Sequence, residues 1–216
     1  MAEFFCVSCR APFLNRFPLD AEGRCALCRA GLRGFDAAYC FGSYDGTLRE
    51  LIHLYKYRGI ETLSKPLAGF LAAALPLDQR FDAVTAVPLH WRKQWQRGFN
   101  QSELLAREIA RRYAVPVVRA LGRVRFTQTQ AGLSNTGRRR NVAAAFRARR
   151  ASKTLAGRRV LLIDDVMTTG STAAACARTL KQAGAASVVL ATVARVDRRF
   201  EGARAQLVSS GEEEVS

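Results

Sequence analysis

The feature that most constrains the fold is a stretch of thirteen residues, 160–172, with the sequence Val-Leu-Leu-Ile-Asp-Asp-Val-Met-Thr-Thr-Gly-Ser-Thr. It begins with a fully apolar run, which is typical of a strand buried on both faces of a parallel sheet. Two carboxylates follow, and a turn of small residues then leads into an alanine-rich segment that favours helix. Open α/β sheets bind phosphate ligands at such strand-to-helix turns. The stretch therefore predicts an α/β fold with an anion site at the carboxyl end of one strand.

The side chains of this stretch suit a sugar phosphate. Gly170 lacks a Cβ atom, so the backbone can approach an oxyanion closely. Four hydroxyl side chains can donate hydrogen bonds, and the helix N-terminus adds positive partial charge. These hydroxyls belong to Thr168, Thr169, Ser171 and Thr172.

The adjacent acids, Asp164 and Asp165, would repel a bare phosphate. We therefore expect them to accept hydrogen bonds from ribose hydroxyls or to hold a divalent cation. A ligand that carries a 5′-phosphate, a diol and a metal-bound diphosphate would use every part of the stretch. The simpler alternative is a strand-to-helix turn in which the acid pair only caps the helix.

Four of the six cysteines have the spacing C-x2-C-x15-C-x2-C, and they are Cys6, Cys9, Cys25 and Cys28. In a cytosolic chain this spacing indicates a metal site rather than disulfides. Four thiolates form the tetrahedral set that Zn2+ prefers, and such a closed site is structural. A redox dithiol pair and an iron–sulfur cluster are the alternatives. Residues 4–31 contain little hydrophobic core, so we expect the metal to supply the folding energy of this module.

The positive charge of the chain is local. The net charge is +16, and residues 92–159 hold 18 Lys and Arg against two acids, whereas the rest of the chain is balanced. The basic region should therefore meet an anion, either a diphosphate or a nucleic acid, unless it is only a solvated surface. Trp91, Trp95 and Phe99 are interleaved with these cations and would either stack on bases or pack on the core.

The remaining pattern predicts alternating strands and helices. Strands are expected at 35–46, 83–87, 115–121 and 187–193, and helices at 47–57, 63–75, 102–113 and 171–183. The loop after the strand at 83–87 is well placed for a diphosphate, with Leu89, His90 and Arg92 facing it. Residues 125–141 favour a long flap over an anionic substrate, and 147–158 favour a basic linker.

Three regions are expected: a zinc ribbon at 1–34, the α/β domain at 35–201 and a disordered tail at 202–216. The first residues lack the basic and apolar pattern of a secretion signal. The longest apolar run, 67–77, is too short to span a bilayer. We therefore expect a soluble, cytoplasmic protein without membrane insertion.

The stretch 160–172 is similar to the phosphoribosyl pyrophosphate (PRPP) motif of type I phosphoribosyltransferases, and the chain as a whole resembles the ComF family (ComFC/GntX-like proteins). Besides the four cysteines, the resemblance rests on 44–46, 56–57, 87–89, 97–101, Gln130, 138–142, Phe146 and 160–172. It implies a type I phosphoribosyltransferase-like parallel sheet flanked by helices, with an amino-terminal four-cysteine zinc ribbon. It also implies PRPP with Mg2+ as ligands, and a link to natural competence and the handling of incoming single-stranded DNA.

Three functions fit these observations. The first is a phosphoribosyltransferase in which Asp164 and Asp165 hold the ribose, and whose acceptor the sequence does not indicate. The second is a non-catalytic protein that senses PRPP with the same fold. The third is a protein that binds single-stranded nucleic acid through the zinc ribbon and the basic stretch, with other competence proteins as partners. The sequence does not indicate the oligomeric state.

Overall fold

The computed structural model describes residues 4–7, 12–13, 16, 19–29, 34–124 and 145–196. The predicted flap and the predicted tail lie outside these residues. So does Cys9, one of the four cysteines of the predicted zinc site.

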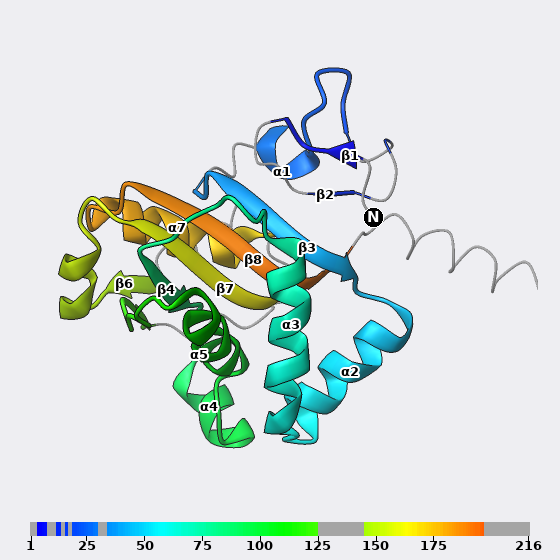
Figure 1. The fold of residues 1–216 in the computed structure, drawn as a ribbon, viewed down its shortest axis with the longest axis vertical. Coiled ribbons are helices and arrows are strands. Elements are labelled where there is room, and N and C mark those ends of the chain that lie inside the picture. Colours follow the sequence, from blue (N-terminus) through cyan, green and yellow to red (C-terminus); the bar gives the residue numbers. More distant parts are fainter. Residues whose placement is uncertain are drawn as a thin grey trace, which may run out of the picture.

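A four-stranded sheet forms the centre of the molecule, with the strand order β3-β8-β7-β4 (Figure 1). The strands are β3 (Ala37–Ser43), β8 (Ser187–Arg195), β7 (Arg159–Met167) and β4 (Ala83–Ala86). Every pairing between them is parallel. Because β7 lies between β8 and β4, its apolar residues at 160–163 are completely buried, as the sequence predicts.

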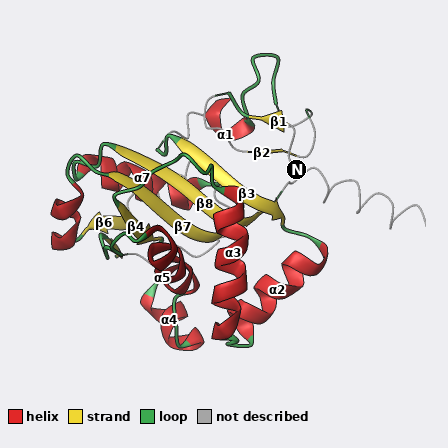
Figure 2. Ribbon diagram, viewed as in Figure 1, coloured by secondary structure: helices red, strands yellow, loops and turns green. Residues whose placement is uncertain are grey.

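Helices cover both faces of this sheet, which confirms the predicted fold class (Figure 2). On one face α3 (Ser64–Ala74) and α5 (Gln101–Tyr113) pack side by side, and α2 (Gly46–Tyr57) lies next to α3. On the other face lies α7 (Ser171–Gln182), which starts directly after the β7 loop. A 3-10 turn, η1 (Glu61–Leu63), connects α2 to α3.

A short helix, α4 (Trp91–Arg97), occupies part of the segment that the sequence predicts as a loop. His90 caps its N-terminus, because its Nδ1 accepts a hydrogen bond of 3.3 Å from the backbone N–H of Arg92. Gly98 ends the helix with φ +79°, a conformation that favours glycine. Sequence patterns do not predict this helix, because it is short and its charge pattern resembles that of a basic loop.

Two small strands lie beside the sheet beyond β4. They are β5 (Leu121–Arg123) and β6 (Phe146–Ala148), which pair antiparallel, and η2 (Arg150–Leu155) follows. Of the strand predicted at 115–121, Val117 forms an isolated bridge to Val84 of β4, and Leu121 begins β5. The prediction of a basic linker at 147–158 was wrong, because Ser152 and Leu155 anchor this segment in the interior.

The amino-terminal module contains β1 (Phe4–Phe5), β2 (Pro12–Phe13) and α1 (Ala26–Arg29). Phe13 is buried, and the guanidinium of Arg195 at the end of β8 lies 4.0 Å from the centre of its ring. Where the chain enters the α/β domain, a Cβ atom on Gly34 would lie 2.3 Å from the carbonyl oxygen of Ala174 in α7. The entry to the domain therefore requires a glycine.

Candidate functional site

The two acids lie at the carboxyl end of β7, where the sequence places them. The hydroxyl of Ser102, in the first turn of α5, donates a hydrogen bond of 3.0 Å to Asp164 Oδ1. The backbone N–H of Asp165 donates to the same oxygen at 3.0 Å. The Asp164 carboxylate is thus held in one orientation by groups from two elements.

A lysine that the sequence did not assign to the site forms an ion pair with one of the two acids. Lys56 lies in the last turn of α2, and its Nζ is 2.9 Å from Asp165 Oδ1. Both side chains are only 13% exposed, so water screens this ion pair much less than one on the surface. In the sequence, Lys56 belongs to the family resemblance at 56–57 and is a basic residue in the last turn of a predicted helix, and neither signal marks it as a site residue.

Burial and neighbouring charge shift the pKa values of this cluster. Burial is the main cause that raises the pKa of Asp164 to about 7, and the negative charge of Asp165 raises it further, whereas Lys56 and Ser102 oppose the rise. For Lys56, burial alone would lower the pKa, but the carboxylates of Asp165 and Asp164 outweigh it and the net shift is upward. The surroundings therefore favour the protonated form of Asp164 more than water does and favour the charged form of Lys56.

The turn after β7 brings the small residues of the motif together. Gly170 has φ +68° and caps the N-terminus of α7, a conformation that a residue with a Cβ rarely adopts. The Thr169 hydroxyl donates to Ser171 Oγ at 3.0 Å and accepts a longer bond of 3.4 Å from the Ser171 N–H. Thr168 is exposed, while Thr169, Ser171 and Thr172 are half-buried. Several hydroxyl and amide donors thus surround the start of α7.

The predicted diphosphate loop follows β4. Asn100 Nδ2 donates 3.2 Å to the carbonyl oxygen of Val87, which ties this loop to the start of α5. Leu89 lines a surface pocket, and His90 is 4% exposed and engaged as the cap of α4. The Arg92 side chain is exposed, with its guanidinium 5.3 Å from the centre of the Trp91 ring. Arg92 is thus the exposed cation among the loop residues that the sequence singled out.

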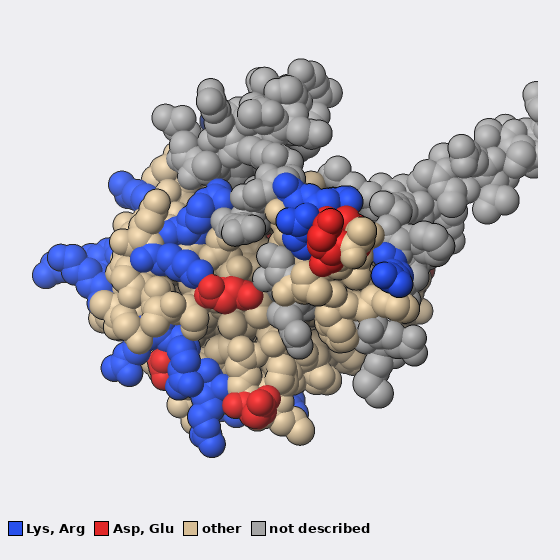
Figure 3. Space-filling view, turned by 90° about the horizontal axis from the view of Figure 1, so that it is seen from above, with Lys and Arg blue, Asp and Glu red and all other residues tan. Residues whose placement is uncertain are grey.

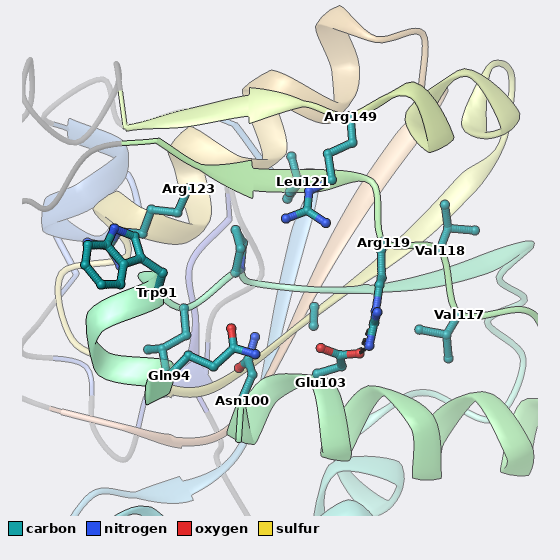
Figure 4. Close-up of a pocket in the computed structure, with 13 residues that line it drawn as sticks. Trp91, Gln94, Asn100, Glu103, Val117, Val118, Arg119, Leu121, Arg123 and Arg149 are labelled. Atoms are coloured by element: carbon teal, nitrogen blue, oxygen red, sulfur yellow. Dashed lines mark hydrogen bonds and ion pairs between the residues drawn. The ribbon is translucent and has the colours of Figure 1, made fainter. Parts of the chain in front are cut away.

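The pocket beside this loop has a volume of about 210 Å³ (Figure 4). It lies on the side of β4 that faces away from β7, and its polar walls come from α4, α5 and the segments around β5 and β6. Three arginines line it, and they are Arg119, Arg123 and Arg149. No sequence pattern indicates that these three meet, because residues far apart in the sequence form one wall.

The three aromatic residues of the basic stretch have different environments. Trp91 is 64% and Trp95 is 84% exposed, whereas Phe99 is 8% exposed and packs 5.7 Å from the ring of Tyr55. Of the two alternatives that the sequence left open, packing on the core applies to Phe99. The indoles of Trp91 and Trp95 face solvent, where stacking on bases is possible.

Three of the four predicted zinc ligands lie together. The Sγ atoms of Cys6, Cys25 and Cys28 are all within 4.8 Å of one another, and all three residues are buried. The backbone N–H of Cys25 donates 3.2 Å to Cys6 Sγ, as is suitable for a sulfur that carries negative charge. Among the described residues none of these cysteines forms a disulfide. The cluster can therefore hold a metal ion.

Described Lys and Arg side chains can be located on one face of the molecule. Figure 3 shows one face, on which Lys and Arg side chains lie in several groups with acidic side chains between some of them. Part of this charge is neutralised locally, as by the ion pair of Arg159 and Asp82. On this face, the Lys and Arg side chains of the described residues thus do not form a single continuous patch.

Comparison with known proteins identifies the class. The family model "Phosphoribosyl transferase domain" matches residues 100–209. "Competence protein F" of Haemophilus influenzae is 32% identical over 178 residues, which are 79% of this chain and 78% of that protein. "DNA utilization protein YhgH" of Escherichia coli (strain K12) is 36% identical over 152 residues, which are 67% of this chain and 66% of that protein.

The chain therefore contains a phosphoribosyltransferase domain of the α/β type described above. It belongs to the ComF family, together with Competence protein F and DNA utilization protein YhgH.

Solved structures give more distant matches. One is described as "Structure of the allosteric regulatory enzyme of purine biosynthesis", with a TM-score of 0.43 and 23% identity; the match covers 61% of this chain and 25% of that one. A glutamine PRPP amidotransferase from B. subtilis gives a TM-score of 0.42 at 24% identity, covering 60% of this chain and 26% of that one. Within the described part of the chain, no helix has the length and apolar character needed to cross a membrane.

Proposed function

We propose that the protein binds PRPP with Mg2+ at the carboxyl end of β7 and that it acts in the use of incoming DNA. The ligand assignment rests mainly on one observation. Two carboxylates, Asp164 and Asp165, lie close in the chain to a turn at 168–172 that offers several hydrogen-bond donors. Asp164 and Asp165 lie a few residues before Gly170, on the same strand-turn-helix unit. A ribose with a phosphate at one end and a diphosphate at the other would contact both parts.

The acid pair suits the ribose hydroxyls and the metal. Asp164 already accepts two hydrogen bonds on Oδ1, which leaves Oδ2 available for a ligand. Asp165 faces the ammonium of Lys56, so a cation is already favoured next to it. When bound, Mg2+ would neutralise charge on the diphosphate; carboxylate oxygens are suitable ligands for it.

The turn at 168–172 suits the 5′-phosphate. The N-terminus of α7 contributes backbone N–H groups and positive partial charge, and the φ of Gly170 presents the backbone at this point without a Cβ atom. Hydroxyl donors come from Thr168, Thr169, Ser171 and Thr172. Leu89, His90 and Arg92 would lie on the diphosphate side, with Arg92 supplying charge.

If transfer occurs, an acceptor attacks C1′ of PRPP, the C1′–O bond breaks and diphosphate leaves with its electron pair. Positive charge develops on the ribose in the transition state, so that a carboxylate nearby stabilises it. Asp164 and Asp165 are the carboxylates on the ribose side. Cations next to the diphosphate would stabilise the leaving group in the same way.

We further propose that the metal held by the cysteine cluster is a structural Zn2+, with Cys9 as the fourth ligand beside Cys6, Cys25 and Cys28. Support comes from the buried thiols and from the spacing of the four cysteines. The same spacing supports the boundary of a zinc ribbon at 1–34, ahead of a phosphoribosyltransferase-like domain at 35–201.

The DNA-related part of the proposal comes from the names of the relatives. One is called a competence protein and the other a DNA utilization protein. The ligand assignment and this biological link are independent, since each can hold without the other.

Isothermal titration calorimetry with PRPP, with and without Mg2+, tests the ligand assignment. We expect Mg2+-dependent binding to the unmodified protein and loss of binding in the Asp164→Asn/Asp165→Asn double variant. Asp82→Asn is a suitable control, because it removes a carboxylate that pairs with Arg159 before β4, at the other end of the sheet. Absence of heat from the unmodified protein would disprove the assignment.

A second measurement separates transfer from binding alone. Diphosphate release from PRPP in the presence of a mixed pool of acceptors would establish a phosphoribosyltransferase. Tight binding without release would favour the alternative, in which the fold senses PRPP and performs no chemistry.

A further inference from the structure

Both tryptophans of the chain lie on α4, and both face solvent. Trp91 and Trp95 are 64% and 84% exposed. Residues four apart on a helix lie on the same face, so the two indoles form one aromatic strip, which we call the indole strip. Two large exposed rings on one helix face are a candidate contact surface, because exposed apolar patches often mark interaction sites.

The arginine-lined pocket adjoins this strip. Trp91 itself lines the pocket, and Figure 4 shows its indole and the guanidinium groups of Arg119, Arg123 and Arg149 around one hollow. At about 210 Å³ the pocket has room for a phosphate group, and the rest of a strand would run along the surface outside it.

The charge balance of the pocket favours an anion. Glu103 is its one carboxylate, and it is already shared by Arg119 and Arg107. Arg149 has no carboxylate within ion-pair distance among the residues that the structure describes. It lies over β5 because Gly122 has no side chain, since a Cβ there would be 3.2 Å from its Nε. The hollow thus keeps a surplus of guanidinium charge.

Aromatic rings and guanidinium groups together are the chemistry that binds single-stranded nucleic acid. Every base offers a ring face for stacking, and every phosphodiester offers a negative charge. In a duplex the ring faces are covered by neighbouring base pairs, and only the phosphates remain accessible. A surface with exposed indoles therefore discriminates in favour of unpaired strands.

We propose that the indole strip and the arginine-lined pocket form a binding surface for single-stranded DNA. Unpaired bases stack on Trp91 and Trp95, and the strand's phosphates lie against the pocket arginines. This inference deepens the DNA-related part of the proposed function and rests on it. It does not require bound PRPP, because neither β7 nor the turn at 168–172 lines the pocket; Leu89 of the predicted diphosphate loop is the residue that the two proposed sites share.

The surface is nevertheless close to the acid pair. Asn100 lines the pocket, and Ser102, in the first turn of the helix that Asn100 caps, donates a hydrogen bond to Asp164. The start of α5 therefore contributes a residue to each of the two sites. A strand on the pocket side would lie beside the predicted diphosphate loop.

Intrinsic fluorescence provides a direct test, because both tryptophans belong to the proposed surface. We expect an oligothymidylate of about 12 nucleotides to quench this fluorescence as it binds. In parallel, anisotropy of a labelled oligonucleotide measures the affinity itself. Binding of the strand elsewhere, such as at the cysteine module, would change the anisotropy and leave the tryptophan emission unchanged, which would overturn the proposal.

Substitutions measure separately how much the indole strip and the arginine-lined pocket contribute to the affinity. Because one base stack is lost, Trp91→Ala and Trp95→Ala should each weaken binding about tenfold. Arg149→Gln should weaken it less and should reduce the slope of log K against log salt by about 0.7. Arg158→Gln, an exposed arginine just before β7 at the other end of that strand, removes equal charge and should leave the affinity unchanged.

Other outcomes would also overturn the proposal. Equal affinity for a duplex of the same length would show that stacking contributes nothing, and tighter binding of an oligouridylate would assign the surface to RNA. Circular dichroism of each variant checks that it is folded. The Asp164→Asn/Asp165→Asn variant should bind the oligonucleotide normally, so that failure of PRPP binding and failure of strand binding are distinguishable.

Discussion

Lys56 Nζ lies 2.9 Å from Asp165 Oδ1, and this ion pair joins the last turn of α2 to the carboxyl end of the central strand. The two residues are far apart in the sequence. Their contact places a resident cation where the proposed site would receive Mg2+. The free protein thus has the negative charge of Asp165 balanced before any ligand binds.

Replacing Lys56 by Met should therefore destabilise the protein and expose the acid pair to other cations. Loss of one partner leaves a largely buried carboxylate without its counter-charge, which costs about 3 kcal/mol in the free energy of unfolding. Urea denaturation measures this cost. Lys65→Met, an exposed lysine on α3, is the control and should change the free energy by less than about 0.5 kcal/mol.

The same variant should bind Mn2+ without PRPP, because the ammonium no longer occupies the position next to Asp165. Electron paramagnetic resonance of free Mn2+ measures this binding directly. Equal Mn2+ affinity in the unmodified protein and Lys56→Met would show that the lysine does not compete with a metal there.

The raised pKa of Asp164 predicts a pH dependence of stability. Its pKa is about 7 in the folded protein and near 3.8 when unfolded, so between these values the folded state binds more protons. The free energy of unfolding should therefore fall as the pH rises from about 4 to 7, by at most about 1.4 kcal/mol per pH unit. This contribution of Asp164 to stability should be fully present below about pH 4.

Asp164→Asn removes this titration and should flatten the profile over that window. Denaturation of both proteins at several pH values provides the measurement. Because other groups such as Asp82 titrate in both proteins, the difference between the two curves isolates Asp164. A difference that grows in the opposite direction would contradict the raised pKa.

Sequence patterns predicted the central unit of the fold well because local signals agree there. An apolar run, two acids, a glycine and an alanine-rich segment all favour a buried strand, a turn and a helix, and β7 and α7 form at these positions. Sequence patterns failed where tertiary contacts, rather than local residue types, determine the conformation of a segment. The segment at 147–158 is basic and would be a linker by composition, yet Leu155 is 1% exposed and holds it in the core.

In the candidate site, too, some residues could be predicted from local sequence patterns and others could not. The acids and the cysteines follow from spacing, whereas Lys56, Ser102 and Arg149 reach their partners only through the packing of distant elements. Phe99 and Trp95 are both aromatic residues in a basic stretch. Only the structure shows that Phe99 packs on Tyr55 while Trp95 remains in solvent.

Substitution of Gly170 tests the proposed phosphate site. A matched glycine elsewhere shows how much of the effect comes from backbone strain rather than from loss of contact with the ligand. Its φ is +68°, and Gly157, just before β7, has φ +70° and open space on the side where a Cβ atom would lie. Gly170→Ala and Gly157→Ala should each lower the free energy of unfolding by about 1 kcal/mol, because alanine is strained at positive φ.

Only Gly170→Ala should also weaken PRPP binding, because its methyl group would project where the backbone is proposed to approach the phosphate. Calorimetry on both variants gives the comparison. Equal PRPP affinity in the two would place the 5′-phosphate away from the start of α7.

Zinc content tests the cysteine cluster. The unmodified protein, purified without chelators, should contain about one zinc per chain, and Cys28→Ser should contain almost none, because a hydroxyl is a much poorer ligand than a thiolate. Cys40→Ser is the matched control, since Cys40 lies in β3 outside the cluster and its thiol donates to the carbonyl oxygen of Gly42, as a serine could.

Loss of zinc should unfold the amino-terminal module and leave the sheet intact. Among its described residues, the module has few buried apolar side chains besides Phe13 and the cysteines, so the metal supplies most of its stability. Limited proteolysis should cut Cys28→Ser within residues 4–29 faster than the unmodified protein, while cleavage after residue 34 stays as it is in the unmodified protein. Cleavage throughout the chain would show instead that the sheet depends on the metal, by way of contacts such as Phe13 with Arg195.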